Sequence, residues 1–205
     1  MTPRTRIYLA SQSPRRRELL KQIGINFETL LLRSNLSRRV DVDETPRIDE
    51  TPEVHVQRVC QEKVNAGWML LQFRNLLPLP VLAADTSVIL DGKIIGKPQD
   101  REQAAATLRV LSGRQHQVLS AVAVSFEERT EMRLSVSKVT MAKLSEERIR
   151  RYILTSEPLD KAGAYGIQGH AAAFIQHIDG SYSGVMGLPL FETAELLKIF
   201  GYPTL

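Results

Sequence analysis

The chain has 205 residues, a formal net charge of +4 at pH 7 and a single cysteine. This length suffices to bury a sizeable core without disulfides or a structural metal. Cys60 has no partner for a disulfide and no surrounding motif of metal ligands, so we interpret it as a small buried hydrophobic residue in a reducing compartment. The sequence predicts one domain over residues 1–205, with two lobes around a cleft as an open alternative.

The amino-terminal segment and the charge pattern bear on location and partners. The apolar run at residues 7–10 is too short for a signal-peptide core or a membrane span, so we expect a cytoplasmic protein without membrane attachment. The excess of basic residues favours an anionic ligand. These residues are scattered and form no basic stripe with aromatic residues between, so nucleic acid is not expected as a partner.

The first expected elements form a strand, a loop and a helix. Residues 6–10 have the composition of a strand, and the helix that follows has Ser13 as its N-cap and Pro14 at its first position. Gly24 is expected to end this helix. Residues 27–32 are predicted to be extended.

A polar segment separates this unit from the next helix. Residues 33–50 lack helical periodicity and predict a loop or flap. The second helix begins at Thr51, and its three- and four-residue spacing places Lys63 on the side that faces the core. The apolar run at residues 81–84 is typical of a central strand, and we expect Asp85 to follow where that strand ends.

The remaining elements alternate between strands and helices. The pair Asp91 and Gly92 predicts a hairpin. Further on we expect a helix from Asp100 to Gly113, strands at 116–126 and 132–143, a helix from Ser145 to 154, a strand at 173–178 and a helix at 189–200. The order predicts an α/β fold with a mixed, twisted sheet flanked by helices.

Three arginines open the first helix, where free backbone N–H groups already carry partial positive charge. Each misplaced cation there costs about 0.3 to 1 kcal/mol. An anion bound at this helix end would explain Arg15, Arg16 and Arg17, and phosphate fits best. The hydroxyls of Ser11 and Ser13 lie beside the same point. Arginines that bend outward into water are the open alternative.

Asp85 and Lys97 suggest a second group of polar residues. A carboxylate beside a buried strand can bind Mg²⁺ together with phosphates, or it can deprotonate a water molecule. Capping of the following turn is the alternative. Lys97, after the hairpin, would bring an ammonium toward the same face.

The segment from Asp160 to Gly169 holds three glycines at three-residue intervals. Such glycines allow backbone N–H groups to approach a ligand, while Lys161 offers a charge and the Gln168 amide both donates and accepts hydrogen bonds. This pattern predicts a site for a polyanion that carries a base, and a plain loop with turn glycines is the alternative. No order typical of covalent catalysis stands out, which favours metal-assisted attack of water on a phosphate.

These residues together resemble the motifs of the Maf nucleotide pyrophosphatases. The matching segments are LASQSPRRRELL at 9–20, ADT at 84–86 with GKP at 96–98, DKAGAYGIQG at 160–169, LSG at 111–113 with His116, and GLP at 187–189. The likeness spans nearly the whole chain in order. It implies a Maf/ITPase-like α/β fold with a central substrate cleft.

The resemblance also implies a reaction and its site residues. Family members hydrolyse nucleoside triphosphates between the α and β phosphates with a divalent cation, Mg²⁺ or Mn²⁺. By resemblance Asp85 is the proton acceptor, and Glu44 and Asp85 hold the metal, with Asp43 as the open alternative to Glu44. Residues implied to bind the triphosphate or to stabilise its charge are Ser11, Arg16, Lys63, Lys97 and Lys161. Members are often dimers, so a homodimer is one alternative, and the sequence leaves the oligomeric state open.

Three positions separate the branches of this family. Arg15, Thr86 and Gln168 match the branch that prefers dTTP and UTP, whereas the 7-methyl-GTP branch differs at all three and has Glu in place of the Gln. A neutral amide can donate to O4 and accept from N3–H of thymine or uracil. We therefore predict a dTTP/UTP pyrophosphatase that also removes modified pyrimidine nucleotides. The alternatives are a 7-methyl-GTP-type pyrophosphatase and a nucleotide-sensing regulator of septum formation.

Overall fold

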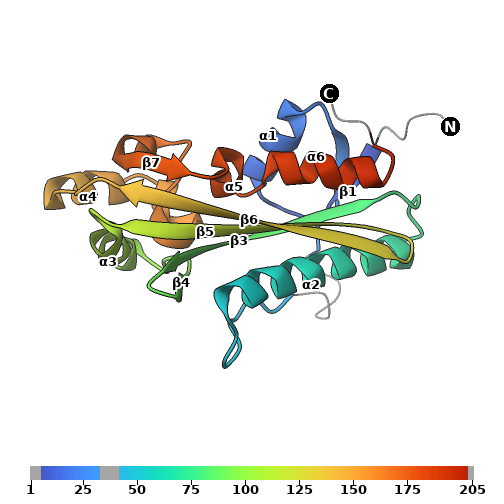
Figure 1. Cartoon of the computed structure of the whole chain (residues 1–205), viewed down its shortest axis with the longest axis horizontal. Coiled ribbons are helices and arrows are strands. Elements are labelled where there is room, and N and C mark those ends of the chain that lie inside the picture. Colours follow the sequence, from blue (N-terminus) through green and yellow to red (C-terminus); the bar gives the residue numbers. More distant parts are fainter. Residues whose placement is uncertain (1–5, 33–41, 203–205) are drawn as a thin grey trace.

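The computed structural model describes residues 6–32 and 42–202, and Figure 1 shows their arrangement. One mixed sheet has the strand order β2-β1-β3-β5-β6-β7, with β4 paired to β3. Strands β2, β1 and β3 are parallel, and the remaining pairs are antiparallel. The strands are β1 (Arg6–Leu9), β2 (Asn26–Thr29), β3 (Val81–Leu90), β4 (Lys93–Ile95), β5 (Gln115–Phe126), β6 (Arg129–Met141) and β7 (Ile175–Asp179).

Helices cover both faces of this sheet. In Figure 1, α2 runs along one face, and α1 and α6 lie on the other. The helices are α1 (Pro14–Gln22), α2 (Pro52–Phe73), α3 (Arg101–Leu111), α4 (Glu146–Ile153), α5 (Tyr182–Met186) and α6 (Leu190–Ile199), with 3₁₀ turns η1 (Glu157–Asp160), η2 (Ala162–Ala164) and η3 (His170–Phe174). The predicted α/β fold with a mixed sheet between helices is confirmed. No helix in the described ranges combines the length and the apolar character needed to cross a membrane.

The predicted helix starts are confirmed by their capping bonds. The side chain of each N-cap residue accepts a hydrogen bond from the backbone N–H three residues further on, and these caps are Ser13, Thr51, Asp100 and Ser145. Each cap satisfies one of the donors that a helix leaves free at its start. The short helix α5 and the three 3₁₀ turns were not predicted from the sequence.

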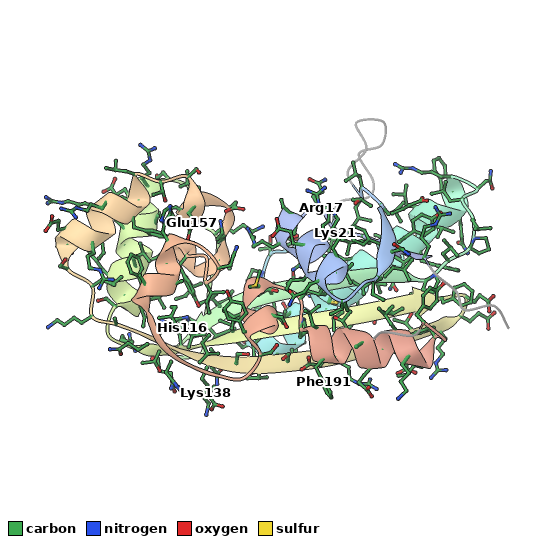
Figure 2. The ribbon with its side chains drawn as sticks, turned by 90° about the horizontal axis from the view of Figure 1, so that it is seen from above. Arg17, Lys21, His116, Lys138, Glu157 and Phe191 are labelled. Carbon is green, nitrogen blue, oxygen red and sulfur yellow. The ribbon has the colours of Figure 1, made fainter. Side chains whose placement is uncertain are left out.

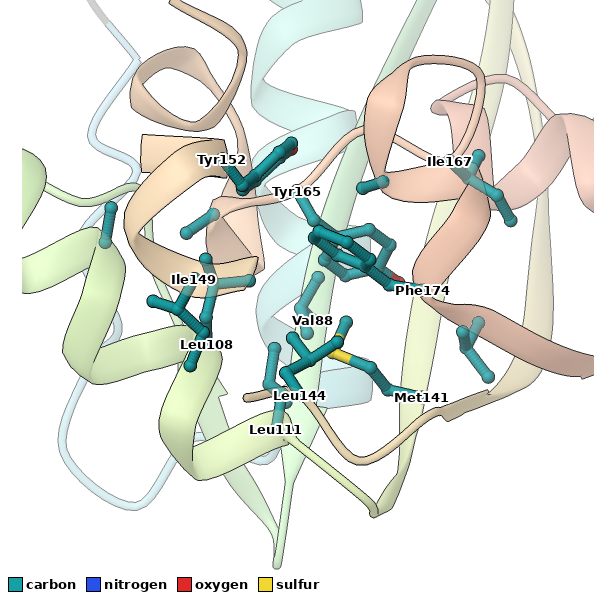
Figure 3. Packing of buried hydrophobic residues seen from close by; sticks show 14 of the residues in the cluster. Val88, Leu108, Leu111, Met141, Leu144, Ile149, Tyr152, Tyr165, Ile167 and Phe174 are labelled. Atoms are coloured by element: carbon teal, nitrogen blue, oxygen red, sulfur yellow. The ribbon is translucent and has the colours of Figure 1, made fainter. Parts of the chain in front are cut away.

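The core is divided by the alternation of side chains along β3. Val81 and Ala83 pack with α2, whereas Leu82 and Ala84 pack with the apolar residues of α1 and α6. Because successive residues of a strand point to opposite faces, the Asp85 side chain points toward α2 and the Thr86 side chain points to the opposite face. A further cluster fills the space beneath α3 and α4, where Figure 3 shows tyrosine, phenylalanine and aliphatic side chains packed together.

Asp85 lies in the middle of β3, so the expectation that the strand ends before it is wrong. Strand β5 pairs with β3 continuously from Val81 to Ile89 and carries the strand past its polar residues. On the other edge, the register pairs of β1 end at Leu82 and those of β4 begin at Val88. Among the described strands, residues 83–87 thus have a free edge between β1 and β4. This interruption of the sheet positions the site.

Candidate active site

A cavity of about 510 Å³ opens along this free edge of β3. It brings together nine of the residues predicted for the site: Arg15, Arg16, Glu44, Lys63, Asp85, Thr86, Lys97, Lys161 and Gln168. Ser11 lines an adjoining hollow together with several of the same side chains. Figure 2 shows α1, with Arg17 and Lys21, apart from the segment that carries Glu157, and cavity residues come from both of these parts.

Lys63 lies between two carboxylates at one side of the cavity. Its Nζ is 2.7 Å from Glu44 Oε1 and 2.7 Å from Asp85 Oδ1. The three side chains come from α2, the loop before it and the centre of β3. Helical spacing places Lys63 toward the sheet, as the sequence predicted, and strand alternation turns Asp85 toward α2.

The electrostatic balance keeps Glu44 ionised at neutral pH. Partial burial raises the pKa of Glu44, but the charge and hydrogen bond of Lys63, together with the charge of Lys97, outweigh this effect and leave the pKa below its usual value. Asp43 is engaged differently, because its Oδ1 accepts a hydrogen bond from the backbone N–H of Thr45 at 2.9 Å. The geometry thus favours Glu44 over Asp43 as a residue directed into the cavity.

The carboxylate pair fits a divalent cation of the magnesium type. Such a cation takes oxygen ligands and uses one or two carboxylates together with water and substrate phosphates. Glu44 and Asp85 already share one cation, the Lys63 ammonium, at close range. Within the described part of the chain, no group of three or more His, Cys, Asp or Glu residues is placed to hold a metal ion. The residues present therefore suit a cation that is shared with a phosphate ligand.

Arg16 connects three parts of the cavity wall. Its Nε donates to the carbonyl oxygen of Gly187 at 2.8 Å, and its two terminal nitrogens reach the hydroxyls of Ser11 and Thr86 at 3.4 Å each. Burial lowers the pKa of Arg16, while Asp85 opposes the shift, and a guanidinium keeps its charge under these conditions. The side chain therefore places a fixed positive charge beside the cavity.

Ser120 is a polar residue of the site that the sequence analysis did not identify. It lies opposite Thr86 in the β3–β5 register, and the two hydroxyl oxygens are 2.9 Å apart. Ser120 donates its proton to the carbonyl oxygen of Gly184 at 2.7 Å, so Thr86 must be the donor between the two hydroxyls. The signal available in the sequence was a serine within the apolar run that forms β5, and in the structure this serine is 1% exposed.

The glycine segment is folded around the side chain of Glu157. This carboxylate accepts hydrogen bonds from the backbone N–H groups of His170 and Ala171, at 2.9 and 3.3 Å, and from the Tyr152 hydroxyl at 2.9 Å. A Cβ on Gly169 would lie 2.2 Å from Glu157 Oε2. The absence of a side chain at this position therefore makes room for the protein's own carboxylate, rather than for a phosphate as the glycine spacing suggested.

Asp160 links the two sides of the cavity. Its Oδ2 is 3.0 Å from Arg15 Nη1, and its Oδ1 is 2.5 Å from Lys161 Nζ. Lys161 also donates to the carbonyl oxygen of Glu157 at 2.6 Å. Two of the predicted cationic residues thus share one carboxylate, and Arg15 is oriented toward the segment that contains Gln168.

One part of the cavity lining is apolar. Val88, Ile95, Ile167 and Met186 line the cavity and pack in one hydrophobic cluster, and Gln168, next to Ile167 in the chain, is an exposed polar residue of the same lining. An apolar slot with one amide suits a flat heterocycle, and the basic end suits phosphates. The fold and the site together define an α/β protein with a cleft for a phosphorylated ligand that bears a base.

Comparison with known proteins identifies the family. Residues 6–200 match the family model described as Maf-like protein, so the chain belongs to this family and the family predicted from the motifs is confirmed. The dTTP/UTP pyrophosphatase of Nitrosomonas europaea is 57% identical over 195 residues, which cover 95% of this chain and 94% of that protein. The dTTP/UTP pyrophosphatase of Aromatoleum aromaticum is 57% identical over 199 residues, with 97% of each chain covered. The solved Ham1 protein of Staphylococcus aureus matches with a TM-score of 0.46 at 19% identity, over 67% of this chain and 72% of its own.

Proposed function

We propose that this chain hydrolyses dTTP and UTP to the nucleoside monophosphate and pyrophosphate, and that it also accepts modified pyrimidine nucleotides. The observation that carries the proposal is the Lys63 ammonium held between Glu44 and Asp85 at the basic end of the cavity. The relatives at 57% identity bear the same activity in their names and cover nearly the whole chain. The physiological consequence would be removal of non-standard nucleotides.

Asp85 is the proton acceptor in the proposed reaction. The residue is 8% exposed and lies at the free edge of β3, where its carboxylate can take a proton from a water molecule that attacks the α,β phosphoanhydride. Glu44 and Asp85 would hold the divalent cation, Mg²⁺ or Mn²⁺, which when bound supplies charge neutralisation and activation of water. Lys63 and Lys97 then stabilise the negative charge that grows as pyrophosphate leaves.

Other side chains bind and select the substrate. Ser11, Arg16 and Lys161 are proposed to hold the triphosphate, because they lie at the basic end of the cavity and its adjoining hollow. Gln168 is proposed to pair with the O4 and N3–H edge of the pyrimidine, with Arg15 and Thr86 as further selective residues of the same cavity lining. A carboxylate in place of this amide would instead favour the donors of a guanine.

A substrate panel tests the proposed function. The purified chain is incubated with each nucleoside triphosphate and with 7-methyl-GTP, in Mg²⁺ or Mn²⁺, and released pyrophosphate is measured. We expect dTTP and UTP to be the best substrates. Preference for 7-methyl-GTP would support the related pyrophosphatase, and tight binding without pyrophosphate release would support a nucleotide-sensing regulator.

Two substitutions test the assigned roles. Asp85→Asn should lower kcat by at least about 100-fold, at the lower end of the effect of removing a positioned general base, while nucleotide binding is kept. Full kcat in this variant would remove Asp85 from the role of general base.

Gln168→Glu should lower kcat/KM for dTTP and UTP without a comparable loss of stability. Unchanged selectivity would show that the pyrimidine is recognised elsewhere. The single domain, the homodimer and the cytoplasmic location remain predictions.

A further inference from the structure

The loop that carries Glu44 is attached to α2 through Arg58. Nη1 of Arg58 donates to the carbonyl oxygen of Asp43 at 3.1 Å, and Nη2 donates to the carbonyl oxygen of Thr45 at 3.0 Å. These are the carbonyls of the residues immediately before and after Glu44. One guanidinium therefore fixes the backbone of Glu44 from both sides.

Arg58 is itself held rigidly. Its Nε and Nη2 form a two-point contact with Glu50, at 2.6 and 3.0 Å, and its Nη1 is 3.3 Å from both oxygens of Glu62. His55 Nδ1 lies 3.2 Å from the Glu50 carboxylate, whose pKa is lowered to about 2, first by the hydrogen bond from Arg58. The Arg58 side chain is only 12% exposed. Such planar, multiply bonded guanidinium contacts are geometrically specific.

Of the two carboxylates, Glu44 is the one whose position depends on hydrogen bonds to its backbone. The Asp85 side chain is 11% exposed and sits within a strand that is paired along its length with β5. The Glu44 side chain is 49% exposed and belongs to a loop without regular secondary structure. Packing therefore fixes one carboxylate of the pair, whereas hydrogen bonds to the loop backbone must fix the other.

We propose that Arg58 is the positioning residue for Glu44, and through it for the divalent cation that Glu44 and Asp85 hold. The inference rests on the proposed function, because that function gives the two carboxylates a common cation. Helix α2 then supplies both the ammonium that meets the Glu44 carboxylate, Lys63, and the guanidinium that fixes its backbone. Arg58 itself touches neither substrate nor cation.

Arg58→Lys is the central test variant. Lysine keeps the positive charge, but a single ammonium cannot bind two carbonyl oxygens and also make the two-point contact with Glu50. Binding of Mn²⁺ to the nucleotide-free protein, measured by electron paramagnetic resonance, should weaken by about 10-fold, as expected for loss of an outer partner of a metal ligand. The Mn²⁺ concentration for half-maximal activity should rise similarly, while kcat at saturating Mn²⁺ changes by less than about twofold.

A double-substitution cycle separates positioning from general stability. In a Glu44→Gln background, Arg58→Lys should cause no further loss of Mn²⁺ binding, because the ligand it positions is already gone. Arg109→Lys serves as the control, since Arg109 makes a comparable two-point contact with Glu146 between α3 and α4. This control should leave Mn²⁺ binding unchanged.

Each outcome decides the inference. Unchanged Mn²⁺ binding in Arg58→Lys, or an equal loss with and without Glu44, would overturn it. If circular dichroism shows that Arg58→Lys does not fold, Glu62→Gln replaces it as the test variant, because it removes a carboxylate partner of Arg58 Nη1. This milder change should weaken Mn²⁺ binding by roughly threefold, which is less than the usual effect of losing an outer partner of a metal ligand. Unchanged Mn²⁺ binding in Glu62→Gln would also overturn the inference. Failure of wild-type protein to release pyrophosphate would refute the proposed function, whereas the nucleotide-free Mn²⁺ measurement tests Arg58 directly.

Discussion

His116 should make the protein less stable as the pH falls below neutrality. The side chain is 2% exposed, its Nε2 is 2.7 Å from the Tyr165 hydroxyl, and its Nδ1 has no hydrogen-bond partner among the described residues. Protonation would bury a charged ring with an N–H group that finds no acceptor. Burial accordingly lowers the pKa of His116 from 6.5 to about 4.

The direction and size of the effect follow from proton linkage. An unfolded histidine binds its proton near pH 6.5, whereas the folded one does so only near pH 4, so acid favours the unfolded chain between these values. The contribution is fully present above pH 6.5 and is lost as pH falls toward 4. The complete gap corresponds to about 3 kcal/mol, of which about 2 kcal/mol would be lost between pH 7 and pH 5.

Urea unfolding at pH 7 and pH 5 measures this loss. Other groups contribute to the total pH dependence, so wild type is compared with His116→Gln, which cannot gain a proton in this range. The variant should lose about 2 kcal/mol less between the two pH values. His177→Gln is the control, because the His177 side chain is exposed on β7. Equal losses in wild type and His116→Gln, or an NMR titration of His116 near pH 6.5, would refute the reasoning.

Two further predictions concern the segment around Glu157. Gly169→Ala places a Cβ 2.2 Å from Glu157 Oε2 and should lower the free energy of unfolding by about 1 to 3 kcal/mol, measured by thermal or urea unfolding. Gly96→Ala is the control, because a Cβ there meets nothing within 4 Å, and it should change the free energy of unfolding by less than about 0.5 kcal/mol. Glu157→Gln removes the ionised acceptor of the backbone N–H groups of His170 and Ala171, which follow Gln168 in the chain. The substitution should therefore raise KM for dTTP several-fold and leave Mn²⁺ binding unchanged. An unchanged KM would show that Gln168 does not depend on Glu157.

Local signals in the sequence predicted local structure well. The caps Ser13 and Thr51 each precede a proline, and this combination sets a helix start through contacts within one turn. The hairpin at Asp91 and Gly92 is confirmed for the same reason, because both residues adopt the positive φ that this turn requires. These features depend on neighbours in the chain and not on the packing of distant segments. Part of the predicted flap, residues 33–41, lies outside the described residues.

Features that depend on distant partners were not predicted. The polar run that begins at Asp85 suggested the end of a strand, because nothing local shows that β5 continues to pair there. The position of Arg58 against the Glu44 loop and the hydrogen bond of Ser120 to Gly184 join segments that only the folded chain brings together. The motifs located residues that line the cavity, but not those that hold them in place.

The charges around the cavity indicate which form of the nucleotide it suits. Its lining includes five cationic side chains of arginine and lysine but three carboxylates, namely Arg15, Arg16, Lys63, Lys97 and Lys161 against Glu44, Asp85 and Asp160. A triphosphate carries about four negative charges, so a free nucleotide would exceed this surplus, whereas a nucleotide with one divalent cation matches it. Arg15 and Lys161 pair with Asp160, and Lys63 pairs with Glu44 and Asp85, so Arg16 and Lys97 are the lining cations that form no ion pair with the described residues. For the proposed function, we therefore expect the metal complex of the triphosphate to bind, with its phosphates directed toward the first turn of α1.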